Sequence, residues 1–430
     1  MGPGYLRQSA DGALYFKIYV ISRENAHPFD AITSGMKATA GSIPSDGEFY
    51  ELTAVTHDGT EWRAMKIWPA FNWDMRNQSV LATGRLQSIM AYLDRPQEQA
   101  YLRLHFFEEY EIPTHLMSEV EHRGSRYSVR DRAEFEASGS KFEVRKREGA
   151  GETLIEARST APFPPYFSLR IQEAFQYLTA KPAFWGARIE TEGEKLAVEL
   201  ISARRKSVRT QLSPPLGRHS IEFFHHGWRL FSQYLTYVLE KTEGAHWNPV
   251  AYHLYNATES TANSVDAWAI GVSVAVEALT SLIQVPAEEA SPDRPDSPNR
   301  LGEFQARLRE YVTEQTEFAD FQNRIHGLIN SMSNRRPQDV LHALATTGHV
   351  DKRYIAAWSD LRNRHVHPKL SDLKKPDPID YQNLLEKIHR AEVLMHQLTF
   401  QMIGYQGPFT DHGERDWPVR PYPLGQTPPA

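Results

Sequence analysis

The first half of the chain is dominated by short runs in which apolar and polar residues alternate. The runs are rich in aromatic and β-branched side chains, and turn residues bound them, which is typical of β-strands with one buried face. They occupy 14–20, 49–55, 101–107, 141–145, 153–157 and 195–202. Asp58-Gly59 predicts a hairpin turn, because this dipeptide adopts the tight turns that join antiparallel strands. One helix, at 167–179, interrupts this pattern.

The second half has a different periodicity, which begins after the Pro-rich turn at 213–217. Apolar residues recur there at steps of three and four, as on the buried face of a helix. Helices are predicted at 228–241, 260–284, 301–314, 318–332, 337–346, 352–366 and 379–403. The Pro-rich segment 286–299 is expected to be an exposed loop.

These two patterns predict an α+β fold class with two domains. The first is a β-rich, sandwich-like domain at 1–217, and the second is an all-α domain at 218–405. The last segment, 406–430, is rich in proline and glycine and is expected to be a tail. A length of 430 residues is enough for two separate cores.

Composition and charge exclude several classes of protein. Lys and Arg number 48 against 54 Asp and Glu, so the formal charge of −6 excludes a globally basic nucleic-acid coat but permits a local basic site. The chain has no cysteine, which excludes disulfide scaffolds, zinc–thiolate sites, iron–sulfur clusters and thiol nucleophiles. No apolar signal segment and no run of roughly 18 apolar residues is visible, so we expect a cytoplasmic protein without a membrane helix.

The common motifs of nucleotide-binding and hydrolytic enzymes do not occur in the sequence. Phosphate-binding loops, nucleophile elbows and the His-Glu-x-x-His metal motif are all missing. His365 and His367 are two positions apart and would point to different sides of a helix. We therefore expect neither a metal site nor a cofactor.

One segment, 358–368, combines three polar groups suited to reaction with a phosphodiester. Arg362 carries a planar, permanently charged donor fork that fits phosphate oxygens. His367 can take or give a proton near neutral pH, and Asn363 can orient either partner by hydrogen bonding. Residues five apart point away from each other on a regular helix. Pro368 disfavours the helical conformation of the preceding residue, so we expect His367 to leave the helical path and approach Arg362.

The spacing Arg362-Asn363-x-x-x-His367 resembles the Arg-polar-x-x-x-His motif of HEPN ribonucleases. The surroundings are similar as well: a long helix with Val-Ala-Val-Glu-Ala-Leu at 274–279 comes first, then a Trp-x-x-Leu-Arg-Asn helix that closes at His-Pro, then a last long helix. A β-rich region before a helical HEPN region resembles the ApeA-like group of bacterial anti-phage proteins. The resemblance covers about 223–405, and over the first half it rests on pattern and order alone.

The resemblance implies a metal-independent RNA endonuclease in anti-phage defence. Arg362 would hold the scissile phosphate, His367 would be the general acid or base, and Asn363 would be the polar neighbour. The RNA 2′-hydroxyl would be the nucleophile, which would leave 2′,3′-cyclic phosphate ends. The implied partners are RNA, with tRNA among the candidates, a second copy of the chain in a homo-dimer or larger homo-oligomer, and an unknown phage-derived trigger sensed by the β-rich domain.

Three further side chains, in or near the motif segment, each have two possible roles. Glu277 interrupts an apolar stretch, and we favour a solvated carboxylate at the edge of that face. The alternative is that Glu277 supports the site by pairing with Arg362 and orienting its guanidinium. Arg364 and His365 are expected to face solvent, with contact to RNA as the alternative.

Other candidate contact residues lie outside the motif. The densest basic run includes Arg204, Arg205 and Lys206, and it is expected to be a solvated loop or strand edge, with contact to RNA phosphates as the alternative. Trp268 and Trp358 are expected to supply the apolar area of a dimer interface.

Two other functions remain open. One is a non-catalytic HEPN-type scaffold that binds nucleotide or protein, and the other is a carbohydrate- or ligand-binding β-sandwich joined to a helical oligomerisation domain. The presence of both Arg362 and His367 favours the ribonuclease, because a scaffold has no need of that pair.

Overall fold

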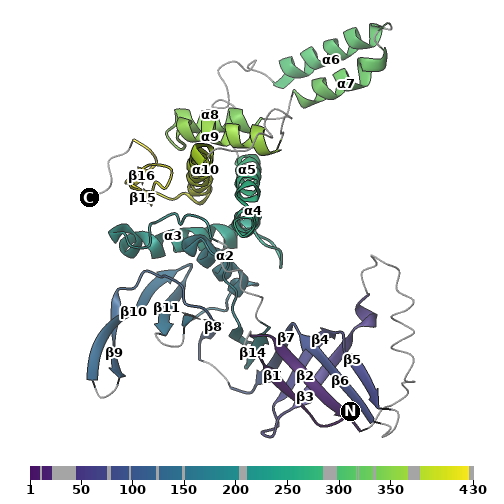
Figure 1. The fold of residues 1–430 in the computed structure, drawn as a ribbon, viewed down its shortest axis with the longest axis vertical. Coiled ribbons are helices and arrows are strands. Elements are labelled where there is room, and N and C mark those ends of the chain that lie inside the picture. The colour runs from purple at the N-terminus through teal and green to yellow at the C-terminus, as the bar shows by residue number, and fades with distance from the viewer. Residues whose placement is uncertain are drawn as a thin grey trace. The chain divides into compact units, whose positions relative to one another are not determined.

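The chain divides into two compact units (Figure 1). The first unit comprises Met1–Phe175, Ala183–Val208 and Glu243–Ala245, and the second comprises Gln176–Pro182, Arg209–Thr242 and His246–Ala430. The predicted boundary at 217 therefore falls inside the second unit. The computed structural model describes residues 1–9, 12–21, 45–74, 79–95, 98–122, 125–147, 151–202, 211–283, 298–315, 317, 319–332, 336–366 and 378–425.

The first unit is built mainly from antiparallel strands. Its strands are β1 (Gly4–Gln8), β2 (Leu14–Val20), β3 (Tyr50–Val55), β4 (Glu61–Ile67), β5 (Ala70–Asp74), β6 (Ser79–Leu86), β7 (Ser88–Leu93), β8 (Ala100–Phe106), β9 (Leu116–His122), β10 (Ser125–Ala137), β11 (Ser140–Arg147), β12 (Glu152–Ser159), β13 (Ala187–Glu192) and β14 (Lys195–Ile201). One sheet has the order β1-β2-β6-β5, and the other has the order β3-β4-β7-β14-β13-β8-β12-β11-β10-β9. Every run predicted as a strand from the sequence is a strand in the structure.

The predicted hairpin joins β3 to β4. Val55 pairs with Glu61 across the turn, and Gly59 has a φ of 83°, which is the conformation that favours glycine at this position. The hairpin prediction is confirmed.

The two sheets of the first unit share a hydrophobic core. Leu14 and Phe16 of β2 lie in one cluster with Leu52 of β3, Ile67 of β4 and Leu86 of β6. Strands β2 and β6 belong to the four-stranded sheet, whereas β3 and β4 belong to the ten-stranded sheet. Side chains from both sheets therefore fill one interior, as in a sandwich-like arrangement.

Another part of the ten-stranded sheet is covered by a helix instead of a second sheet. Helix α2 occupies Phe167–Thr179, the range predicted from the sequence. The Phe175 ring lies 5.1 Å from that of Phe106 in β8, and the Phe167 ring lies 6.1 Å from that of Phe142 in β11, measured between centroids. The mixed α+β class is thus confirmed, although the β-rich half contains more than a sandwich.

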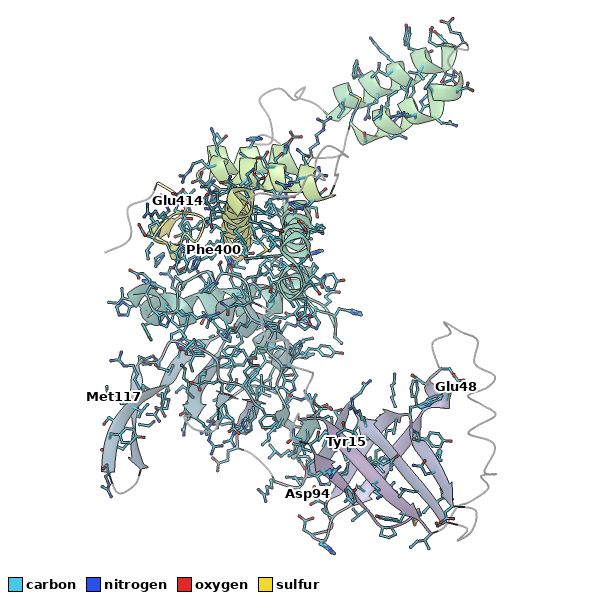
Figure 2. The ribbon with its side chains drawn as sticks, viewed as in Figure 1. Tyr15, Glu48, Asp94, Met117, Phe400 and Glu414 are labelled. Carbon is cyan, nitrogen blue, oxygen red and sulfur yellow. The ribbon has the colours of Figure 1, made fainter. Side chains whose placement is uncertain are left out.

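The second unit is mainly helical. Its longer helices are α3 (Ile221–Lys241), α4 (Pro249–Ser260), α5 (Val265–Leu282), α6 (Pro298–Glu314), α7 (Ala319–Ser331), α8 (Pro337–Thr346), α9 (Lys352–Leu361) and α10 (Pro378–Ile403), and a π-helical turn, η3 (Arg362–Val366), follows α9. Helix α4 is the one that the sequence pattern did not predict. Ser264 starts α5 by accepting a hydrogen bond from the backbone N–H of Ala267. Helix α10 is buried on all sides between 391 and 400, and Phe400 lies among densely packed side chains (Figure 2).

The segment 406–425 is folded, which corrects the prediction of a tail. It contains β15 (Gly407–Thr410) and β16 (Val419–Tyr422), which pair antiparallel. Phe409 and Tyr422 are buried, and Asp411 is buried with its carboxylate accepting a hydrogen bond from the Tyr354 hydroxyl. Proline and glycine content indicates backbone constraint, but it does not prevent aromatic side chains from packing into the core.

Helix α5 is long and apolar enough to cross a membrane, judged by length and composition alone, and it is the one such helix among the described residues. One face of α5, which includes Ala269, Val272 and Val276, is buried within the second unit. The helix packs against α4, α9 and α10, as the core helix of a helical bundle does.

Candidate functional site

Helix α9 ends in an unusual turn at the predicted motif. Asp351 caps the start of α9 by accepting a hydrogen bond from the backbone N–H of Arg353 at 2.9 Å. At the other end, Arg362–Val366 forms a π-helical turn instead of a further α-helical turn. Such turns are rare, have i→i+5 hydrogen bonds and occur frequently at functional sites. The sequence predicts a loosened helix end beside Pro368; His367 and Pro368 themselves lie outside the described residues.

Arg362 and Glu277 form a two-point ion pair between η3 and α5. Arg362 Nε donates to Glu277 Oε2 at 2.7 Å, and Arg362 Nη2 donates to Glu277 Oε1 at 3.1 Å. The side chains are 31% and 38% exposed, so the pair is open to solvent on one side. The hydrogen bond to Glu277 raises the pKa of Arg362 further above its usual value. The position that we favoured for Glu277, solvated and unpaired, is therefore corrected to the alternative.

Helix geometry explains why these two side chains meet. Trp358 and Arg362 are four residues apart on one side of the α9 end, and Ser273 and Glu277 are four residues apart on α5. The indole Nε1–H of Trp358 donates to the backbone oxygen of Ser273 at 3.0 Å. Arg362 then reaches Glu277 one turn further along, and its guanidinium carbon lies 6.0 Å from the centroid of the Trp358 ring.

His365 is also turned toward α5, which corrects the prediction that it faces solvent. Its side chain is 8% exposed, and its Nδ1 lies 3.3 Å from Oδ1 of Asp266. Burial lowers the pKa of His365, partly offset by the Asp266 carboxylate. The Nε2 atom is buried and has no hydrogen-bond partner among the described residues. Asp266 and Glu277 are eleven residues apart, or about three turns, so His365 and Arg362 contact one face of the same helix.

The remaining predicted contact residues differ in how they are placed. Asn363 and Arg364 are exposed in the π-turn, so Arg364 faces solvent as predicted. The basic run with Arg204, Arg205 and Lys206 lies outside the described residues. Within the described part of the chain, no three His, Asp or Glu side chains are grouped so that they could hold a metal ion.

The two tryptophans expected at a dimer interface have roles inside the second unit. Trp358 is 1% exposed, so it cannot offer contact area to another chain. The Trp268 indole Nε1–H donates to Oε1 of Glu392 on α10 at 2.8 Å. The prediction that both residues supply an interface is therefore wrong for Trp358, because its ring is needed to pack α9 against α5.

A buried acidic residue on α10 was not identified from the sequence. Glu392 is completely buried, and its Oε2 accepts a hydrogen bond from the backbone N–H of Ser213 at 3.2 Å and lies 3.3 Å from His389 Nδ1. Burial tends to raise the pKa of Glu392, but the hydrogen bond and charge of His389, together with the hydrogen bond of Ser213, outweigh burial, so the pKa is lowered. The sequence does contain a signal for this residue: a glutamate stands inside the apolar run 391–395, where a buried charge needs hydrogen-bond or ionic partners.

We expect the free energy of unfolding to fall as the pH decreases from about 6.5 to about 4, and His412 to cause part of that fall. Burial, together with the nearby His396, lowers the pKa of His412 from 6.5 to about 4, and its Nε2–H donates to the Pro214 oxygen at 3.0 Å. The unfolded chain takes up this proton below 6.5, whereas the folded chain does so only near 4. In that window the unfolded state binds more protons, so acid favours unfolding.

The variant His412→Gln keeps an N–H donor but cannot titrate. Urea denaturation at several pH values should show that its free energy of unfolding depends less on pH than that of the parent, by roughly 1–3 kcal/mol across the window. The same pH dependence in both proteins would contradict this assignment.

The structure brings Arg362 and His365 of η3 together with Glu277 and Asp266 of α5, and Asn363 is exposed on the same turn. The α9–η3 end and α5 therefore form the candidate site. Comparison with models of protein families, with curated proteins and with solved structures gives no match to this chain.

Proposed function

We propose that this chain is a metal-independent RNA endonuclease of the HEPN type that acts in anti-phage defence. The observation that supports this best is the two-point hold of Glu277 on Arg362 at the start of a π-turn, within the Arg-Asn-x-x-x-His spacing. A guanidinium fixed on one side and exposed on the other is suited to bind a phosphate oxygen.

The proposed reaction is an internal transfer at the RNA phosphate. The 2′-hydroxyl attacks the adjacent phosphorus, the bond to the 5′-oxygen of the next nucleotide breaks, and a 2′,3′-cyclic phosphate and a 5′-hydroxyl result. His367 takes the proton of the attacking hydroxyl or supplies one to the leaving oxygen. Arg362 offsets the added negative charge of the transition state, and Asn363 donates a hydrogen bond beside it.

The proposal extends to assembly and control. Two copies of the chain with facing motifs would supply both a proton acceptor and a proton donor to one cleft, as a two-fold interface allows. The second unit corresponds in this proposal to the HEPN-like helical domain, and the first unit to a sandwich-like sensing domain for a phage-derived trigger. The protein would act in the cytoplasm, where RNA, including tRNA, is available.

A non-catalytic HEPN-type scaffold is the second candidate, and one observation favours it. Glu277 already occupies two N–H groups of Arg362 and neutralises its charge. A partly exposed ion pair of this kind also occurs simply as a helix–helix contact, with little effect on stability. A measurement of cleavage separates the two candidates.

We expect purified full-length protein to cleave total RNA or tRNA in the presence of EDTA, because the proposed chemistry uses only side chains and the RNA 2′-hydroxyl. The ends are checked by treatment with a phosphatase that requires a linear phosphate, before and after acid opening of the cyclic phosphate. The matched control is the same RNA with 2′-O-methyl groups, which lacks the nucleophile. Cleavage of that RNA, or activity that returns only with a divalent ion, would contradict the proposal.

A further inference from the structure

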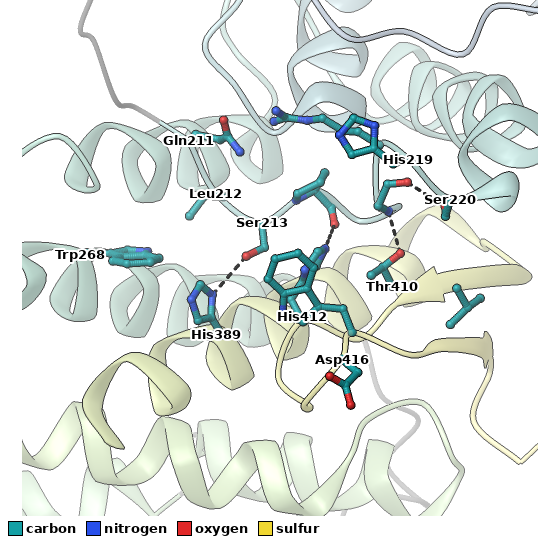
Figure 3. Close-up of a pocket in the computed structure, with 15 residues that line it drawn as sticks. Gln211, Leu212, Ser213, His219, Ser220, Trp268, His389, Thr410, His412 and Asp416 are labelled. Carbon is teal, nitrogen blue, oxygen red and sulfur yellow. Dashed lines mark hydrogen bonds between the residues drawn. The ribbon is translucent and has the colours of Figure 1, made fainter. Parts of the chain in front are cut away.

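A second candidate site lies in the same unit, away from the Arg362–Glu277 pair. A pocket of about 530 Å³ opens between the start of α3, the start of α5, α10 and the β15–β16 segment (Figure 3). The side chains that give it chemical character are Arg218, His219, Trp268, His389, His412 and Trp417. Its volume is within the range of small-molecule sites, which are concave, mostly apolar and have a few fixed polar groups.

The orientation of the His389 ring is fixed through one of its two nitrogens. Its Nδ1 lies 3.3 Å from Oε2 of the buried Glu392 and 3.2 Å from Oγ of Ser213. The pKa of Glu392 is lowered, so this carboxylate is ionised and can only accept. Nδ1 must therefore carry a proton, which leaves Nε2 as the ring nitrogen that can contact a ligand. The His389 side chain is partly exposed and lines the pocket.

Aromatic rings form the walls of the pocket. The Trp268 ring meets that of His389 edge-on, with 5.4 Å between centroids, and the Trp417 ring lies 5.2 Å from that of His412. Trp417 is 64% exposed, which is unusual for so large an apolar side chain. Asp416 and Trp417 have φ values of 63° and 50°, a backbone conformation that bulky residues rarely adopt. The Trp417 indole is thus largely exposed where it lines the pocket.

Charge in the pocket is concentrated near the start of α3. Arg218 and His219 precede Ser220, which caps α3, and Arg218 Nη2 donates to the Thr179 oxygen at 3.1 Å, which fixes the guanidinium. Asp416 is the one carboxylate among the described lining residues, and in Figure 3 it lies on the opposite side of His412 from His219. One end of the pocket is therefore cationic, and the other part is aromatic.

We propose that this pocket binds a nucleotide with a terminal phosphate. Its base would stack on Trp417, its phosphate would bind Arg218 and His219, and a polar group of the base or sugar would contact His389 Nε2. A free mononucleotide and the phosphorylated end of an oligonucleotide share this chemistry. The site is independent of the Arg362 pair and does not require that the protein cleaves RNA.

Isothermal titration calorimetry of the full-length protein tests the proposal, with AMP and UMP as probes and adenosine, ribose 5-phosphate and inorganic phosphate as controls. We expect the mononucleotides to bind more tightly than any of the three fragments, since each fragment lacks one half of the contacts. Comparison of AMP with a 5′-phosphorylated dinucleotide distinguishes the two sources: tighter binding of the dinucleotide identifies an oligonucleotide end, and equal or weaker binding identifies a free nucleotide.

Four variants assign the binding to this pocket. Trp417→Ala should weaken AMP binding about 5- to 150-fold, the range for loss of one base–aromatic stack, whereas Trp417→Phe should retain most of it. His389→Asn keeps a donor toward Glu392 but has no counterpart of Nε2, and it should also weaken binding. Trp68→Ala, at an exposed tryptophan of the first unit, is the matched control and should bind as the parent does. Three outcomes would overturn the proposal. Trp417→Ala and Trp68→Ala could bind AMP with equal affinity, the parent could bind AMP and ribose 5-phosphate equally, or the parent could show no binding at millimolar AMP.

Discussion

Replacement of His367 by alanine is expected to slow RNA cleavage by about 10²- to 10⁴-fold, the contribution typical of a general acid or base. The expectation follows from the proposed proton transfer at the 2′-hydroxyl or the leaving oxygen, since a histidine can take or give a proton near neutral pH. His342→Ala removes an exposed histidine of α8 and is the matched control. Rates are measured with a labelled RNA under single-turnover conditions, alongside melting curves. A His367→Ala protein with unchanged rate and unchanged melting would end the catalytic assignment.

Arg362→Ala should reduce cleavage to a similar degree while it changes the free energy of unfolding by only about 0–1 kcal/mol. The small effect on folding is expected because the pair with Glu277 is partly exposed, and such pairs contribute little to stability. Glu277→Gln keeps a hydrogen-bond acceptor but removes the charge, so it should slow cleavage less than Arg362→Ala does. Arg307→Ala, at an exposed arginine of α6, controls for general loss of positive charge. If neither Arg362→Ala nor Glu277→Gln changes the rate, Arg362 is a structural ion-pair residue. The non-catalytic scaffold then becomes the better proposal for the function.

Local structure could be predicted well from the sequence because its causes are local. The Asp58-Gly59 turn fixes the β3–β4 register, and the range of α2 at 167–179 follows from its own apolar spacing. The order of strands in the sheet could not be predicted in this way. Strands β13 and β14 are inserted between β7 and β8, which requires pairing of residues about a hundred positions apart, such as Ala197 with Tyr92. Such pairing depends on shape and burial in three dimensions.

The errors at the end of the chain and in α4 have a common physical cause. Proline and glycine in 406–425 suggested a tail, yet Phe409 and Tyr422 bury their rings in the second unit. In α4 the apolar positions Val250 and Leu254 lie among tyrosine, histidine and threonine residues that weaken the pattern. In both cases a few buried side chains determine the fold, and average composition conceals them.

The candidate site was predicted in part. The motif indicated Arg362 as the phosphate ligand, but it did not show whether Glu277 faces that residue. The answer depends on which faces of α5 and α9 meet. Trp358 and Arg362, and likewise Ser273 and Glu277, are one turn apart, so one contact between these helices implies the other. A search for matching four-residue spacings on two predicted helices would have favoured the pair.

Replacement of Glu392 by alanine is expected to lower the free energy of unfolding by about 3–5 kcal/mol, as for the loss of one partner from a buried charged group. The substitution would leave the partly buried Trp268 indole N–H and Ser213 backbone N–H without their acceptor, and His389 without its carboxylate. Chemical denaturation of the full-length protein measures the change. Glu386→Ala is the matched control, because Glu386 lies on the same helix with an exposed side chain, and it should change stability by less than about 0.5 kcal/mol.

The pH dependence distinguishes a buried charge from simple loss of packing. The pKa of Glu392 is lowered from 4.5 in the folded state, so its stabilising effect is complete above that value and is lost as the pH falls through the lower, folded pKa. Glu392→Gln preserves the size of the side chain but stays neutral, and it places an NH₂ group against N–H donors that need an acceptor. Its deficit relative to the parent should therefore be large near neutral pH and should shrink in acid. A deficit that stays constant from neutral pH to below 4.5 would show that the misplaced amide group, and not the loss of the carboxylate charge, destabilises the Glu392→Gln protein.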